Sequence, residues 1–117
     1  MRSKLLFRKP SSKLLTKVRM IKMKVKVQYL GYIKNMLNKR EDILEIDEGA
    51  HLSDLLNKLA GVNGAAFQKE VYEPGIPDVK TGFSVTINGI FIGQLGGLNA
   101  KLSEGDNVML MSLMSGG

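Results

Sequence analysis

The chain has 117 residues, 44% of them hydrophobic and 24% charged, which fits one small folded domain and excludes a disordered or collagen-like chain. It contains no cysteine, which excludes disulfides, thiolate metal sites and a cysteine nucleophile. No apolar run approaches the roughly 18 residues that a membrane helix needs, so we expect a soluble, cytoplasmic protein without a membrane span.

The formal net charge of +6 arises in the first 22 residues. This leader holds eight basic side chains and no acidic one, whereas residues 23–117 hold nine basic and eleven acidic side chains. We therefore expect a basic leader, 1–22, a folded domain, 23–117, and no specific binding of nucleic acid. The leader has the composition of an organelle transit peptide. A disordered arm, or a start assigned too early given Met20 and Met23, is the favoured interpretation.

Period-two alternation predicts that the domain begins with a strand at Met23. Val25, Val27 and Tyr29 alternate with polar residues, as in a strand with one buried face. Residues 31–40 are mixed and polar and predict a long connection. Residues 43–46 then predict a second short strand.

Leucine spacing predicts the main helix. The segment 52–60 has an apolar stripe at i, i+3, i+4 and i+7 that should pack on the sheet. Gly61, Asn63 and Gly64 are expected to end this helix, and residues 65–72 to form another helical turn or two. The leucines of the stripe are Leu52, Leu55, Leu56 and Leu59.

The lone His51 stands where this helix should be capped. Without a second histidine or any cysteine it predicts a cap or surface residue, with Asp54 as its capping-box partner, and no metal site. The glycine-rich segment 93–97 lacks the spacing of a phosphate loop and predicts a surface turn. The acidic run 41–48 offers no acid and base pair and predicts a solvated face, with docking of a basic partner as the alternative.

Asn88-Gly89, between apolar runs, is a strong hairpin signal because a type I′ turn needs two residues that tolerate positive φ. A last strand is expected over 107–113. Two strands, a helix, a hairpin and a last strand are the order of an α+β domain. We therefore predict a β-grasp (ubiquitin-like) fold, a mixed sheet with one main helix packed on one face.

The last strand and the end of the chain carry the candidate site. Val108 and Leu110 alternate with Met109 and Met111, so one pair should face the core and the other solvent or a partner, unless the strand is covered on both faces. Met is common at adaptable binding surfaces, which makes Met109, Met111 and Met114 docking candidates.

Gly116 and Gly117 follow this strand. Only glycine lets backbone thread closely into a narrow channel of a partner enzyme, although many tails end in small, disordered residues. Adenylation of a terminal carboxylate would produce a mixed anhydride that sulfide or an amine can attack.

Four segments together resemble the MoaD/ThiS family. They match an apolar strand that ends in Asn-Gly, a glycine-containing loop, Leu-x-x-Gly-Asp-x-Val, a short strand and a terminal diglycine. The resemblance is dense over residues 82–117, looser over 24–60 and absent from the leader. The segments are Phe83-Ser-Val-Thr-Ile-Asn-Gly89, Leu98 to Leu102, Glu104-Gly105-Asp106-Asn107-Val108 and Ser115-Gly116-Gly117.

This resemblance implies a sulfur carrier that is not itself an enzyme. Gly117 would be adenylated by a ubiquitin-activating-like adenylyltransferase and become a thiocarboxylate, with Gly116 as its threading partner. The carrier would bind no cofactor, because ATP belongs to the activating enzyme. The implied docking tail runs from Met111 to Ser115, so the predicted partner-binding residues are Met109, Met111, Leu113, Met114 and Ser115.

The pathway rests on the same resemblance. Residues 64–82 resemble the extra helix and loop of MoaD-like members, which favours molybdopterin biosynthesis and the large subunit of molybdopterin synthase as partner. Many relatives carry an aromatic residue and two prolines before the last small residues, where this chain has Met111-Ser112-Leu113-Met114. The alternatives are sulfur transfer for thiamine or tRNA thiolation, a protein modifier joined to target lysines, and, outside the family, a β-grasp binding module.

Overall fold

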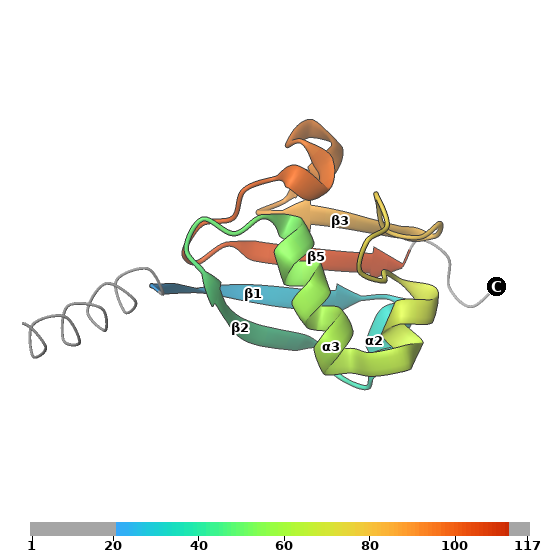
Figure 1. Cartoon of the computed structure of the whole chain (residues 1–117). Helices are drawn as coiled ribbons and strands as arrows, with labels where there is room; N and C mark the ends of the chain where they lie inside the picture. Colours follow the sequence, from blue (N-terminus) through green and yellow to red (C-terminus); the bar gives the residue numbers. More distant parts are fainter. Residues whose placement is uncertain (1–20, 113–117) are drawn as a thin grey trace, which may run out of the picture.

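The computed structural model describes residues 21–112, which form a five-stranded mixed sheet crossed on one face by a long helix (Figure 1). The strand order is β2-β1-β5-β3-β4; β1 and β5 are parallel and the other neighbours antiparallel. The predicted β-grasp fold is confirmed. In chain order the elements are β1 (Lys22–Leu30), α2 (Tyr32–Leu37), β2 (Glu41–Asp47), α3 (Leu52–Glu70), β3 (Phe83–Ile87), β4 (Ile90–Phe91), the 3-10 turns η1 (Ile92–Gln94) and η2 (Gly97–Asn99), and β5 (Asn107–Ser112).

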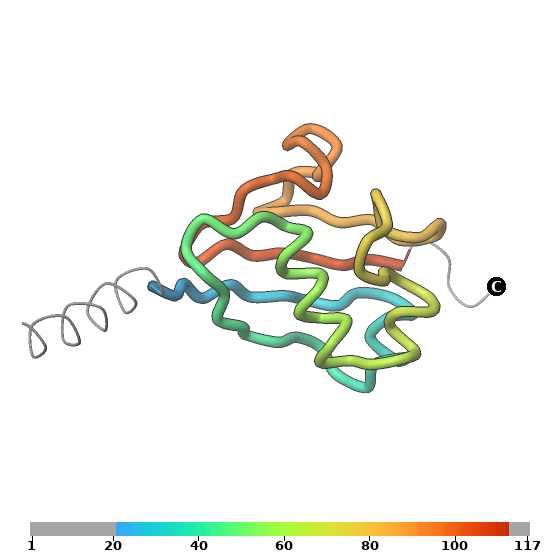
Figure 2. Tube along the Cα trace, in the orientation of Figure 1, coloured from blue at the N-terminus to red at the C-terminus, as the bar shows by residue number. Residues whose placement is uncertain are grey.

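The core lies between α3 and one face of the sheet. Val25, Val27 and Tyr29 of β1 are buried there, as their alternation predicts. All four leucines of the predicted stripe are fully buried in the same cluster. In Figure 2 the start of β1 and the end of β5 lie at opposite ends of the sheet.

Helix α3 is longer than predicted. Gly64 adopts φ 74° and interrupts the helical path, but the helix resumes beyond it and ends at Glu70. The predicted interruption at Gly64 is therefore confirmed, and the predicted further turns follow it as a second part of the same kinked element. Phe67, in this second part, is fully buried in the core. The Asn63 side-chain amide donates to the Leu59 carbonyl at 3.1 Å, and the Gln68 side-chain amide donates across the kink to the Ala60 carbonyl at 3.1 Å. No helix within residues 21–112 combines the length and apolar character needed to cross a membrane.

Residues 31–40 connect β1 to β2 as predicted, but they contain the six-residue helix α2, which was not predicted. Its one fully buried side chain is Ile33. A helix this short does not complete two turns, so it leaves no periodic pattern for the sequence to display. The cap predictions hold better: His51 is the N-cap of α3, and its N–H donates to Asp54 Oδ2 at 2.8 Å.

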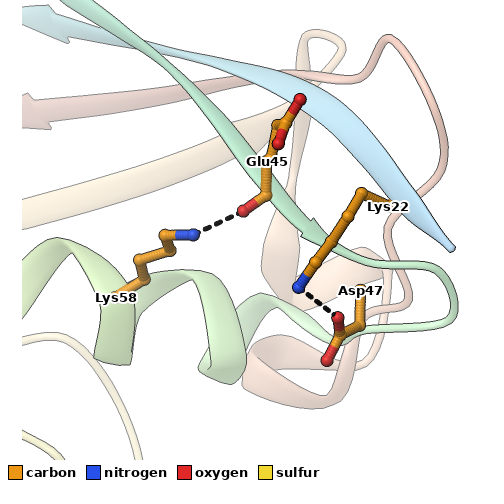
Figure 3. A network of polar contacts seen from close by, with 4 residues as sticks. All are labelled: Lys22, Glu45, Asp47 and Lys58. Atoms are coloured by element: carbon orange, nitrogen blue, oxygen red, sulfur yellow. Dashed lines mark hydrogen bonds and ion pairs between the residues drawn. The ribbon is translucent and has the colours of Figure 1, made fainter. Parts of the chain in front are cut away.

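Strand β2 forms one edge of the sheet, and charged groups close that edge (Figure 3). Lys58 of α3 donates to the carbonyl of Glu45 at 2.5 Å, and Lys22 pairs with Asp47 at 2.7 Å. The hydrogen bond from Lys22 lowers the pKa of the Asp47 carboxyl. Charged side chains on an edge disfavour pairing with another chain. The acidic run is exposed except for Asp42, which largely confirms the predicted solvated face.

Candidate functional site

Strand β5 separates a buried face of the sheet from an open one. Val108 and Leu110 are fully buried against the α3 side, whereas Met109 and Met111 are half-buried on the opposite face. The expected alternation is confirmed, and the strand is not covered on both faces by the described residues. Whether Met109 and Met111 bind a partner stays a prediction.

Register brings further apolar side chains to the same face. Met111 lies opposite Leu30 of β1, and Met109 lies opposite Thr86 of β3, which in turn pairs with Phe91 of β4. Leu30 and Phe91 are 51% and 53% exposed. We call Leu30, Phe91, Met109 and Met111 the open-face patch. Exposed apolar side chains gathered on one face are typical of an interaction site.

Basic side chains border this patch. A hollow of about 580 Å³ next to it is lined by residues from β1, α2, the start of β2 and β5. Lys34 and Arg40 supply its positive charge, and neither forms an ion pair within residues 21–112. The lining residues are Gln28, Tyr29, Leu30, Lys34, Arg40, Glu41 and Met109.

Sequence reasoning missed Leu30, Phe91 and the basic border. Leu30 carried a signal, because it is the one apolar residue in the polar phase of β1 after Lys24, Lys26 and Gln28. Phe91 carried a weaker one, since it follows the Asn-Gly turn in a short apolar run. Neither signal shows that the two side chains share a face.

The residues of the family-like motif hold the start of β5. Asn88 and Gly89 have φ 52° and 86°, which confirms the predicted hairpin turn. The Asn88 side chain accepts from the Asn107 N–H at 2.9 Å and donates to Asp106 Oδ1 at 2.9 Å. Asp106 Oδ2 also accepts from the Ser103 N–H at 2.8 Å. These bonds fix where β5 begins, and therefore where it ends.

A second network of polar side chains joins β1, the connection that follows it and β2. The hydroxyl of Tyr29 donates to Asp42 Oδ2 at 2.6 Å, and Lys39 Nζ lies 2.9 Å from the same oxygen. Burial, followed by the bond to Asp42, raises the pKa of Tyr29 above its usual value, so this tyrosine stays neutral. The network ties the end of β1 to the start of β2.

The predicted docking tail, Met111 to Ser115, begins within the last two residues of β5, which ends at Ser112. Because β1 and β5 are parallel, this point lies beside the end of β1, next to the open-face patch. The predicted site residues Leu113, Met114, Ser115, Gly116 and Gly117 lie outside the described residues, as does the leader up to residue 20. Within residues 21–112 no cluster of three or more His, Cys, Asp or Glu side chains is arranged to hold a metal ion.

A model of the ThiS family matches residues 27–117. The chain belongs to the ThiS family. This confirms the resemblance to MoaD/ThiS proteins and places the chain among ubiquitin-like sulfur carriers and modifiers, whose members are small carrier proteins. The family match extends over both the open-face patch and the predicted tail. A comparison with curated proteins yields no match.

Solved structures share the fold. The putative molybdopterin converting factor, subunit 1, from Pyrococcus furiosus is 25% identical with TM-score 0.62, over 79% of this chain and 99% of that one. Small archaeal modifier protein 1 from Methanosarcina acetivorans is 22% identical with TM-score 0.65, over 83% and 99%. The HVO 2177 protein of Haloferax volcanii is 22% identical with TM-score 0.67, over 82% and 88%.

Proposed function

We propose that this ThiS-family protein is a sulfur carrier that is charged at the carboxylate of Gly117. The observation that supports this most is the position of the tail root, at a sheet corner beside an exposed apolar patch. A carboxylate oxygen of Gly117 attacks the α-phosphorus of ATP held by the activating enzyme, and pyrophosphate leaves. A sulfide-level nucleophile then attacks the acyl carbon, AMP leaves, and a thiocarboxylate remains.

The open-face patch would hold the folded domain while the tail reaches the ATP. The five residues 113–117 span at most about 18 Å when fully extended, at roughly 3.3–3.6 Å per residue. A partner must therefore contact the domain close to Ser112. Leu30 and Met111 meet that condition because they form the last pair between β1 and β5, and Met109 lies two residues earlier on the same face of β5.

We further propose that the sulfur acceptor is the pterin precursor bound by a large molybdopterin synthase subunit. The kinked second half of α3 and the loop that follows support this, because they correspond to the extra helix and loop expected of MoaD-like members. The likeness to a putative molybdopterin converting factor subunit points the same way.

Protein modification is the second candidate. The likeness to a small archaeal modifier protein favours it. It uses the same adenylation, but a lysine amine then attacks the acyl carbon and an isopeptide bond forms in place of the thiocarboxylate.

Intact mass spectrometry of the protein from its native host tests both candidates, with a Gly117 deletion as control. The sulfur carrier predicts a species in which one oxygen is replaced by sulfur, and this species should vanish in the deletion. Conjugates without a thiocarboxylate would favour the modifier. If neither the thiocarboxylate nor conjugates are found in cells that depend on the molybdenum cofactor, both candidates are contradicted.

A further inference from the structure

We propose that Ser112 is a positioning residue that fixes the start of the tail, residues 113–117, for adenylation. Gly31 lies against Ser112 and makes room for its side chain. This role depends on the proposed charging of Gly117. Ser112 is the last residue of β5, one position beyond the final β1–β5 pair, Leu30 and Met111. In the strand register, Ser112 therefore pairs with Phe83 of β3 and with no residue of β1.

The Ser112 side chain supplies a connection to the β1 side. Its Oγ accepts a hydrogen bond from the Ile33 N–H at 3.2 Å and donates to the Leu30 carbonyl at 3.4 Å. Ile33 lies in the first turn of α2, where N–H groups lack an acceptor within the helix. Its side chain is fully buried, so α2 is anchored in the core. The root of the tail is thus tied to a rigid element.

Gly31 makes this contact sterically feasible. A Cβ at this position would lie 2.6 Å from Ser112 Oγ and 3.1 Å from the Ser112 carbonyl oxygen. Its φ of 84° also disfavours any residue with a side chain. Two independent constraints therefore require glycine at the corner where β1 turns into α2.

The hydrogen bonds of Ser112 to Ile33 and Leu30, which we call the clamp, lie on the sheet face opposite the open-face patch. Side chains alternate along β5, so Ser112 points to the α2 side whereas Met111 points to the open face. A partner seated on the patch does not displace Ser112. Docking of the domain and orientation of the tail are therefore controlled by different side chains, and mutations can separate them.

Orientation matters because the tail must be ordered when it enters the activating enzyme. Fixing the backbone of one residue carries an entropic cost that corresponds to about a tenfold change in an equilibrium constant. With Ser112 fixed in the free protein, the tail loses less freedom on binding. We expect S112A to lower kcat/KM for adenylation by about tenfold.

The test uses the full chain and the purified adenylating enzyme encoded in the same genome, with pyrophosphate release as the readout. S112A should show the loss in kcat/KM, S112T should restore it by retaining the hydroxyl, and S53A on α3 should behave as wild type. In chains truncated after Leu113, S112A should bind the enzyme as tightly as its parent. An equal kcat/KM for S112A and wild type would overturn the role.

Two further results would also decide the matter. If the truncated S112A chain loses as much affinity as the full-length S112A chain loses in kcat/KM, the positioning role of Ser112 is overturned, because the effect does not then depend on the tail. Hydrogen exchange should be faster at the Ile33 amide in S112A and unchanged at Val27, which detects the clamp without any enzyme. A wild-type chain that is not adenylated would instead overturn the proposed function, and this role with it.

Discussion

Replacing Phe91 by alanine tests the open-face patch. Phe91 is 53% exposed, so a partner that covers the open face would bury about half of its side chain. Full burial of a phenylalanine contributes about 1.5–3 kcal/mol, so half corresponds to about 1 kcal/mol or slightly more. The dissociation constant for the activating enzyme should therefore rise by about five- to tenfold.

Val62 provides the matched control, because it is also apolar and 53% exposed but lies on α3. Calorimetry with chains lacking Gly117 measures binding without the reaction, and thermal unfolding confirms that both variants are folded. Val62→Ala should bind as the parent chain does. Unchanged affinity for Phe91→Ala, or an equal loss in both variants, would refute docking through the open face.

Three further changes test the fold around the site. Phe67→Ala should destabilise the domain by about 3–5 kcal/mol in urea unfolding, because its ring is fully buried beyond the kink; less than about 1 kcal/mol would mean that this half of α3 is not part of the core. Asp106→Ala should cost about 1–2 kcal/mol, because the Ser103 N–H and the Asn88 amide lose their acceptor, and unaltered exchange along β5 would contradict this. Stability should fall as pH rises above about 10, where the unfolded chain releases the Tyr29 proton first, and Tyr29→Phe should reduce that fall.

The sequence predicted the parts of the fold that depend on local patterns. The alternation in β1, the leucine stripe of α3 and the Asn88-Gly89 turn each show the period or φ requirement of one element. The interruption of α3 at Gly64 was predictable from its glycine, but the joining of the two helical parts into one kinked element was not. Phe67 in the second part is fully buried in the core cluster, whose other members lie far from it in the sequence, so no local pattern reports its place.

The site was predictable only where its residues share one strand. Met109 and Met111 could be proposed because their alternation with Val108 and Leu110 is local. Leu30 and Phe91 join them through the pairing of β1 with β5 and of β4 with β3, which no local pattern reports.

Both ends of β5 are tied to other parts of the chain by side-chain hydrogen bonds. Asn88 and Asp106 fix its start, and the Ser112 contact with Leu30 and Ile33 fixes its end. A carrier that presents one carboxylate to two enzymes needs a tail that can enter two different channels. It also needs a fixed starting point for the tail. Each partner binds the folded domain, so the position of Ser112 on that domain sets how far the tail can reach. Fastening β5 at both ends meets the second requirement of the proposed carrier.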